Sequence, residues 1–213
     1  MDYIGYIGVD MQFARLSQAE MMQNRIVFID NYDLPDTDLS AFVGLVITNY
    51  TDEQFMVKHK QLFEDYLAGG GVIFSTAEMG ESYIPNVPVW RRSPTPIRER
   101  DMIVTDPEYP MFKGIDPYDL NYRQGVKGFF TRGYFTEVPE NAEVIVKDEK
   151  DEPVIYVDRH STNGTIIAGA GTDLYQMYRQ ETPETSTAHK LTSTIFEAIR
   201  YEAQRLQGGS TNE

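Results

Sequence analysis

Cysteine is absent from the 213-residue chain. Its absence excludes disulfide bonds, zinc–thiolate sites and thiol nucleophiles. Because cysteine-free chains fit a reducing compartment, we expect a cytoplasmic protein. Long apolar runs are also missing, and no stretch approaches the roughly 18 residues that a membrane-spanning helix needs. The segment MDYIGYIGVD has no basic region and carries Asp2, which argues against a secretory signal. No membrane association is therefore expected.

Positive charge is scarce as well. The chain has 33 acidic side chains against 19 basic ones, for a formal net charge of −14. A surface of that sign repels phosphate backbones, so nucleic acid is not expected as a partner. The charge favours solubility, although it leaves open a surface that engages a basic partner. With only three histidines, the chain also offers few side chains that could act as a general base near neutral pH.

The residues that are present favour a globular fold. Hydrophobic residues make up 41% of the chain and include 11 Phe and 14 Tyr, which is enough for a sizeable core. The length suits one domain. We expect residues 1–207 to form a single α/β domain and residues 208–213 to form a disordered tail.

The strongest local signal lies between residues 44 and 78. Gly44–Thr48 is a short apolar strand, and Val72–Ser75 is another. Between them, Thr51 with Gln54 three positions later is typical of a helix N-cap and capping box, and Gly69–Gly71 marks the end of the helix. Side chains at helical spacing form one apolar face: Phe55, His59, Leu62, Phe63 and Tyr66. The pattern predicts one parallel β-α-β unit.

Further elements flank this unit. Strands are expected at 3–9 and 25–30, a helix at 12–23, and a helical turn at 39–42. Near the end, strands at 143–147, 154–158 and 165–168 are separated by turns, which favours antiparallel pairing, and a helix follows at 185–206. Together they predict a three-layer α/β sandwich with a mostly parallel central sheet and a late antiparallel extension.

Residues 80–140 differ from the rest and contain eight of the eleven prolines. We interpret them as a long excursion from the sheet, with a strand at 102–105 and a strand-like segment at 125–135. Its aromatic residues, Trp90 among them, fit either a subunit interface of a homo-oligomer or a flap over the core. Four arginines could clamp a carboxylate or phosphate, or neutralise the acidic surface: Arg91, Arg92, Arg98 and Arg100.

In an open parallel sheet, ligands bind beyond the carboxyl ends of the strands. The residues that follow the predicted strands are Asp10, Gln12, Asp30, Asn31, Asp33, Asn49, Tyr50, Ser75, Thr76, Glu78, Thr172 and Asp173. Such a crevice is polar and acidic, and it suits a sugar or another small polar molecule. Asp30, Asn31 and Asp33 are also common turn formers. The side chains expected to bind the ligand are Asp10, Asn31, Asn49, Tyr50, Ser75, Thr76, Glu78 and Asp173.

The same crevice could hold catalytic groups. Ser75 or Thr76 would need an adjacent base to act as a nucleophile, and a Ser75–His189–Asp173 arrangement is one way to supply it. Glu78 is a further acid at this edge. Of the other histidines, His59 is expected to pack on its helix and His160 to lie exposed in a turn.

Asp10, Glu78 and Asp173 would suit a hard cation. They lack the spacing of a loop site, so neither a metal nor a cofactor is expected.

Four segments carry a family resemblance: GLVITN, DYLAGGGVIFS, DPEYPMFKGI at 106–115, and DEPVIYVDRHSTNGTIIAGAGTDL at 151–174. Their order resembles the class I glutamine amidotransferase-like superfamily and, within it, the ThuA-like group. The resemblance covers most of the chain and implies a flavodoxin-like sandwich with a nucleophile elbow after the strand VIFS.

The departures from that pattern bear on function. Ser75 and Thr76 stand where the resemblance places a nucleophilic cysteine, and the late segment GTIIAGAGTDLYQMY lacks the family's His-x-Glu pair. Glutamine amidotransfer is therefore not expected. Three hypotheses remain. The chain is a non-catalytic module that binds a small polar ligand or a protein partner in the crevice, a hydrolase or sugar-processing enzyme that uses Ser, Asp or Glu there, or an assembly protein that interacts through 80–140.

Overall fold

The central sheet of the computed structural model has eight strands in the order β2-β1-β3-β4-β12-β11-β10-β6, within the described residues 2–14, 16–128 and 130–209. The first five are mutually parallel, and the last three continue the sheet in antiparallel fashion. The strands are β1 (Ile4–Gly8), β2 (Ile26–Asp30), β3 (Gly44–Ile47), β4 (Val72–Ser75), β6 (Met102–Val104), β10 (Glu143–Asp148), β11 (Pro153–Asp158) and β12 (Thr165–Gly169). The predicted α/β sandwich with a late antiparallel extension is confirmed.

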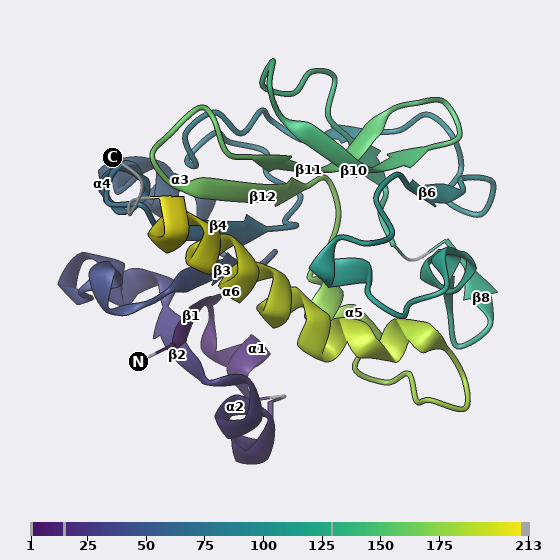
Figure 1. Cartoon of the computed structure of the whole chain (residues 1–213), viewed down its shortest axis with the longest axis horizontal. Helices are drawn as coiled ribbons and strands as arrows, with labels where there is room; N and C mark the ends of the chain where they lie inside the picture. Colours follow the sequence, from purple (N-terminus) through teal and green to yellow (C-terminus); the bar gives the residue numbers. More distant parts are fainter. Residues whose placement is uncertain (1, 15, 129, 210–213) are drawn as a thin grey trace.

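Helices and short hairpins surround this sheet (Figure 1). The α-helices are α1 (Asp10–Phe13), α2 (Gln18–Asn24), α3 (Glu53–Lys58), α4 (Gln61–Ala68), α5 (Leu174–Tyr178) and α6 (Leu191–Gly209). The 3-10 helices are η1 (Asn31–Asp36), η2 (Leu39–Ala41), η3 (Pro110–Phe112), η4 (Pro117–Asn121) and η5 (Thr187–Lys190). Two small antiparallel pairs join β5 (Arg91–Arg92) to β9 (Gly133–Tyr134) and β7 (Tyr122–Arg123) to β8 (Val126–Lys127).

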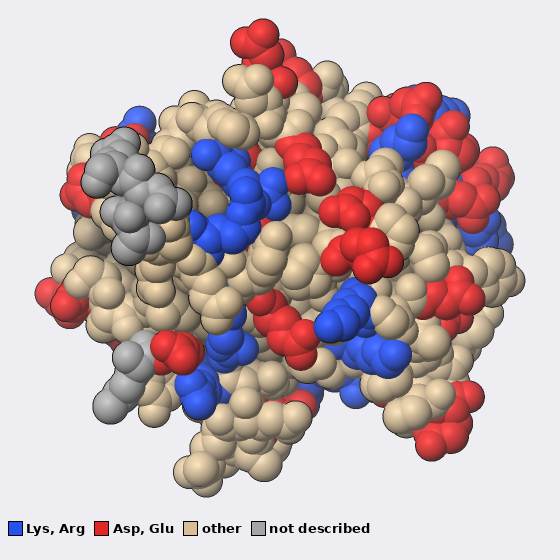
Figure 2. All heavy atoms as spheres, in the orientation of Figure 1, with Lys and Arg blue, Asp and Glu red and all other residues tan. Residues whose placement is uncertain are grey.

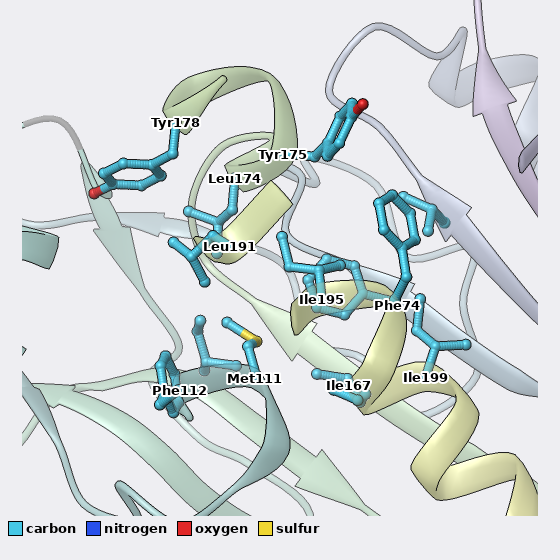
Figure 3. Close-up of a cluster of buried hydrophobic side chains, with 14 of the residues drawn as sticks. Phe74, Met111, Phe112, Ile167, Leu174, Tyr175, Tyr178, Leu191, Ile195 and Ile199 are labelled. Carbon is cyan, nitrogen blue, oxygen red and sulfur yellow. The ribbon is translucent and has the colours of Figure 1, made fainter. Parts of the chain in front are cut away.

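Each face of the sheet buries its own hydrophobic cluster because side chains alternate along every strand. On β4, Phe74 belongs to the cluster under α5 and α6, whereas Ile73 belongs to the cluster under α3 and α4. Figure 3 shows Ile195 and Ile199 of α6 close to Phe74 and the sheet. Side chains of η3 pack into the same cluster, which makes α6 and the 109–120 segment one covering layer.

The predicted β-α-β unit is present, with two corrections. Asp52, and not Thr51, caps the helix, because its Oδ1 accepts from the Phe55 amide at 3.1 Å. The single predicted helix is broken into α3 and α4 at His59, which stacks on Phe55 at a centroid distance of 4.3 Å. The glycine stop is confirmed, since Gly69 is the C-cap and Gly70 has a φ of +85°.

Three other boundaries differ from the expectation. The helix predicted at 12–23 is the pair α1 and α2, with Arg15 between them outside the described residues. The terminal helix begins as η5 at Thr187 and runs to Gly209. Gly208 and Gly209 are therefore helical, and the part of the predicted tail at 210–213 lies outside the described residues.

The 80–140 segment does not leave the sheet entirely. Met102–Val104 pairs with β10 and forms one edge of the sheet, so the strand predicted at 102–105 is present. The strand-like segment expected at 125–135 consists instead of the two short pieces β8 and β9, with residue 129 outside the described part.

Charges of both signs are interspersed on the face that carries α6 (Figure 2). No single acidic field covers that face, although the net charge is −14. This distribution agrees with the interpretation of the charge as a solvated surface. Among the described helices, none is both long and apolar enough to cross a membrane.

Candidate functional site

Two adjoining cavities lie at the carboxyl ends of the parallel strands, and we refer to them together as the crevice. The smaller has a volume of about 190 Å³ and the larger about 360 Å³. Both are lined by Tyr50, Thr172 and Met177, which join them. The smaller is also lined by Met11, Gln12, Arg123, Asp173 and Gln176, and the larger by Asn49, Glu78, Ile97, Gly128, Thr131, Arg132 and Gly171.

Asp173 is the N-cap of α5, and its carboxylate is fully engaged. Oδ1 accepts from the Gln176 amide at 3.1 Å, and Oδ2 accepts from the Tyr6 hydroxyl at 2.5 Å. Burial raises the pKa of Asp173, even though the hydrogen bonds from Tyr6 and from the helix backbone act in the opposite direction. Burial likewise raises the pKa of Tyr6, so the hydroxyl remains a donor.

Gln12 is a buried amide that is only partly satisfied. Its Oε1 accepts from the Thr48 hydroxyl at 2.6 Å and from the Val9 amide at 3.3 Å. Its Nε2 is buried and has no hydrogen-bond partner among the described residues. The absence of a side chain at Gly8 makes this position available, because a Cβ there would lie 2.2 Å from Gln12 Oε1.

Asn49 presents the complementary group in the larger cavity. Its Nδ2 donates to the Gly171 carbonyl at 3.3 Å, which ties the end of β3 to the loop after β12. Its Oδ1 is buried and unpartnered within the part of the chain that is described. Tyr50, next in sequence, is 58% exposed between the two cavities. The crevice therefore holds a buried donor in one cavity and a buried acceptor in the other.

The elbow after β4 contributes less than its position suggests. Ser75 is buried and, by strand alternation, lies on the face of Ile73 beneath α3 and α4. Thr76 is buried as well, and its hydroxyl donates to the Thr172 carbonyl. Only Glu78 is exposed and lines the larger cavity.

The postulated Ser75–His189–Asp173 arrangement is not assembled. His189 belongs to η5, whose neighbours Ala188 and Leu191 pack in the cluster on the opposite face of the sheet from Ser75. Its Nδ1 lies 2.7 Å from the Ser186 carbonyl oxygen. The Asp173 carboxylate is bound to Tyr6 and to the helix backbone instead.

Acidic groups do not gather into a metal site either. Within the described ranges, no three His, Asp or Glu side chains are placed to hold a metal ion. Asp10, Glu78 and Asp173 therefore do not form the hard-cation site considered from the sequence.

Several predicted ligand-binding residues lie away from the crevice wall. Asp10 is exposed in the first turn of α1. Asn31 is buried, and its Oδ1 accepts from the Asp52 amide at 3.2 Å, so it supports the start of α3. Asp30 caps η1 through the Tyr32 amide, which agrees with a turn-forming role. Of the predicted set, the structure brings together Asn49, Tyr50, Glu78 and Asp173.

Two arginines of the crevice were missed by sequence reasoning. Arg123 lines the smaller cavity and Arg132 lines the larger, and both come from the proline-rich segment. Nothing in the local pattern around them marks a site. Arg100, by contrast, is 2% exposed and donates to the buried Asp148 at 2.8 Å, so it is not available to clamp a ligand.

A larger depression of about 870 Å³ lies at the opposite, amino-terminal edge of the sheet. It is lined by η2, α4, the glycine stop and the end of α6. None of the predicted site residues is in its described lining, and open parallel sheets bind ligands at the other edge. We therefore take the crevice as the candidate site.

No protein-family model matches the chain, and no curated protein matches its sequence. Solved structures do share its fold. A cytoplasmic protein of Salmonella typhimurium LT2 superposes with a TM-score of 0.55 at 10% identity, over 95% of this chain and 99% of that chain. A candidate GMP synthase component from Thermoplasma acidophilum superposes with a TM-score of 0.59 at 10% identity, over 97% of this chain and 98% of that chain.

At this identity the likeness concerns the fold alone. It supports a coarse amidotransferase-like α/β fold. The ThuA-like subgroup, the cytoplasmic location, the protein partner and the homo-oligomer stay predictions.

Proposed function

We propose that this chain is a non-catalytic binding protein on an amidotransferase-like fold, and that the crevice receives a small polar molecule. The observation that carries the proposal is the Nε2 of Gln12, a buried donor without a partner among the described residues, beside a cavity. An unsatisfied buried polar group costs roughly 1–3 kcal/mol, and an acceptor on a ligand would remove that cost.

The size and chemistry of the crevice also support the proposal. Taken together, the two cavities fall within the roughly 300–1,000 Å³ that small-molecule sites occupy. Tyr50 and Met177 supply apolar surface, while Gln12 and Asn49 supply a few polar groups that could orient the ligand. The hydroxyl of Thr76 and the carboxylate of Asp173 are committed to the protein's own structure, which is why we favour binding over catalysis.

Native mass spectrometry of the purified full chain tests the proposal. The wild-type protein is expected to carry, or to take up from a deproteinised metabolite extract, a small molecule that adds a defined mass. Thr172→Phe should abolish the added mass, because Thr172 lines both cavities and the larger ring would fill their junction.

Thr136→Phe is the matched control, because Thr136 is exposed and lies outside the crevice lining. Circular dichroism should show that both variants remain folded. A bound mass that persists in Thr172→Phe, or the absence of any bound mass in the wild type after exposure to the extract, would contradict the proposal.

A further inference from the structure

The crevice gathers cationic side chains on a protein that is acidic as a whole. Arg123 lines the smaller cavity and Arg132 the larger. Arg132 is exposed and takes part in no ion pair within the part of the chain that the structure describes. The acids that line the cavities are Glu78 and Asp173, and the latter already accepts from Tyr6. With two cations against two acids, the crevice departs from the net charge of −14 on the whole chain.

The hairpin β7-β8 holds Arg123 at the cavity. Its turn residues Gln124 and Gly125 have φ values of 49° and 76°, the left-handed conformation that tight hairpin turns require. The Gln124 amide donates to Glu181 Oε1 at 2.6 Å, and Glu181 is itself 7% exposed. This contact ties the hairpin to the segment after α5 and fixes where Arg123 is presented.

Two kinds of N–H donor therefore line the smaller cavity. The guanidinium of Arg123 has five N–H groups, and one of its nitrogens donates to Gln180 Oε1 at 3.4 Å. Gln12 adds the buried Nε2. A cationic fork beside a neutral donor suits the oxygens of a carboxylate or a phosphate, because charge-assisted hydrogen bonds are the stronger ones.

The larger cavity asks for the opposite chemistry. The Oδ1 of Asn49 is a buried acceptor, so the part of a ligand that reaches it must carry a donor. A hydroxyl or an amine would serve. The two cavities adjoin through Tyr50 and Thr172, so one small molecule can present its anionic end to one cavity and its donor to the other.

We infer that the crevice selects a small organic anion, with its carboxylate or phosphate group against Arg123 and Gln12 and a hydroxyl or amine against Asn49. The inference rests on the proposed function and narrows it, because a neutral polyol would satisfy the proposed function equally well.

Nuclear magnetic resonance of the ¹⁵N-labelled full chain tests this inference through the side-chain amide of Gln12. Three probes are compared: malate, its neutral diamide, and inorganic phosphate. Malate, phosphate or both should shift the Gln12 signal saturably, and the diamide should bind at least about tenfold more weakly than malate if the carboxylate is the recognised group, since a charge-assisted hydrogen bond contributes about 1.5–3 kcal/mol. Response to malate alone identifies a carboxylate ligand, and response to phosphate alone identifies a phosphate ligand.

Arg123→Gln should weaken binding of the anionic probe at least about tenfold, with partial recovery in Arg123→Lys. Arg91→Gln is the matched control, because Arg91 is exposed in β5 and outside the crevice lining. Equal binding of malate and its diamide without a phosphate response, no response to either anion, or unchanged affinity in Arg123→Gln would overturn the inference.

Failure of the inference can be told apart from failure of the proposed function. If the mass bound in native mass spectrometry is lost in Thr172→Phe but retained in Arg123→Gln, the crevice binds a ligand that is not selected by charge, and only the inference is wrong. If the wild-type chain takes up no molecule at all, both are wrong.

Discussion

The hydroxyl of Tyr6, on the first strand, donates to the carboxylate of Asp173 at 2.5 Å, across 167 positions of sequence. The pair is buried at the carboxyl edge of the sheet, where Asp173 also caps α5. One carboxylate therefore joins the first strand to a helix near the end of the chain, and the ligand cavity forms beside that junction.

The raised pKa of Asp173 predicts an unusual pH dependence. The unfolded chain releases this proton near the ordinary value of 3.8, whereas the folded chain retains it to higher pH. Stability contributed by the protonated group is therefore present below that value and is lost as the pH rises through the folded pKa. Asp173→Asn should remove this loss, because asparagine can still cap α5 and contact Tyr6.

Urea unfolding of the wild type and Asp173→Asn at a series of pH values from about 3.5 to 7 measures this effect. The unfolding free energy of the variant, relative to the wild type, should increase with pH. A difference that stays constant or decreases would show that burial does not dominate the titration of Asp173.

The ion pair of Arg100 and Asp148 is a second buried link. Arg100 donates to Asp148 Oδ2 and to the carbonyls of Thr131 and Gly133, with almost no exposure of either charged side chain. Arg100→Ala should cost about 3–5 kcal/mol, because it leaves a buried carboxylate without its cation. Chemical denaturation measures the loss.

Arg91→Ala provides the comparison for this measurement. Arg91 is exposed, so its removal should change the unfolding free energy by about 0.5 kcal/mol or less. The double variant Arg100→Met with Asp148→Asn should recover part of the loss caused by Arg100→Ala. Equal costs for Arg100→Ala and Arg91→Ala would contradict the assigned role.

Thr76 is predicted to support the crevice and not to act as a nucleophile. Its hydroxyl donates to the carbonyl of Thr172, the residue shared by both cavities. Thr76→Val should destabilise the fold by about 1–3 kcal/mol, because the Thr172 carbonyl loses this donor. Thr76→Ser keeps the hydroxyl and should cost less. The opposite order in thermal or urea unfolding would rule out the hydrogen bond as the reason.

The close approach of α6 to the sheet predicts a steric effect at Gly44. A Cβ at this position would lie 2.1 Å from Ile199 Cγ2, so Gly44→Ala should overpack the core and cost about 1–3 kcal/mol. Gly208→Ala is the matched change, because the added Cβ would have no described neighbour within 4 Å and alanine favours a helix. It should be neutral or stabilising, and equal losses for the two variants would refute the packing argument.

Much of the fold could be predicted because its signals are local. The apolar runs of β3 and β4 and the glycine stop at Gly69–Gly71 each lie within a few residues and were interpreted correctly. The cap at Asp52 and the break at His59 were missed, since Thr51 and Asp52 are both good cap residues and only packing chooses between them.

The candidate site was less accessible to this reasoning. Strand ends point to the correct edge of the sheet, and Asn49 and Glu78 do line the crevice. Whether a polar group is available there depends on its neighbours, however. Thr76 and Asp173 are held by partners from other parts of the chain, and Ser75 lies on the face beneath α3 and α4.

The amino-acid sequence by itself determined the order of strands and helices and the edge of the sheet where a site belongs, because alternation and apolar spacing are properties of neighbouring residues. Only the tertiary structure decided which side chains meet at that edge. The hairpin that presents Arg123, the Tyr6–Asp173 contact and the buried amide of Gln12 beside the cavity arise from the packing of segments that are distant in sequence, and no local pattern encodes such a meeting.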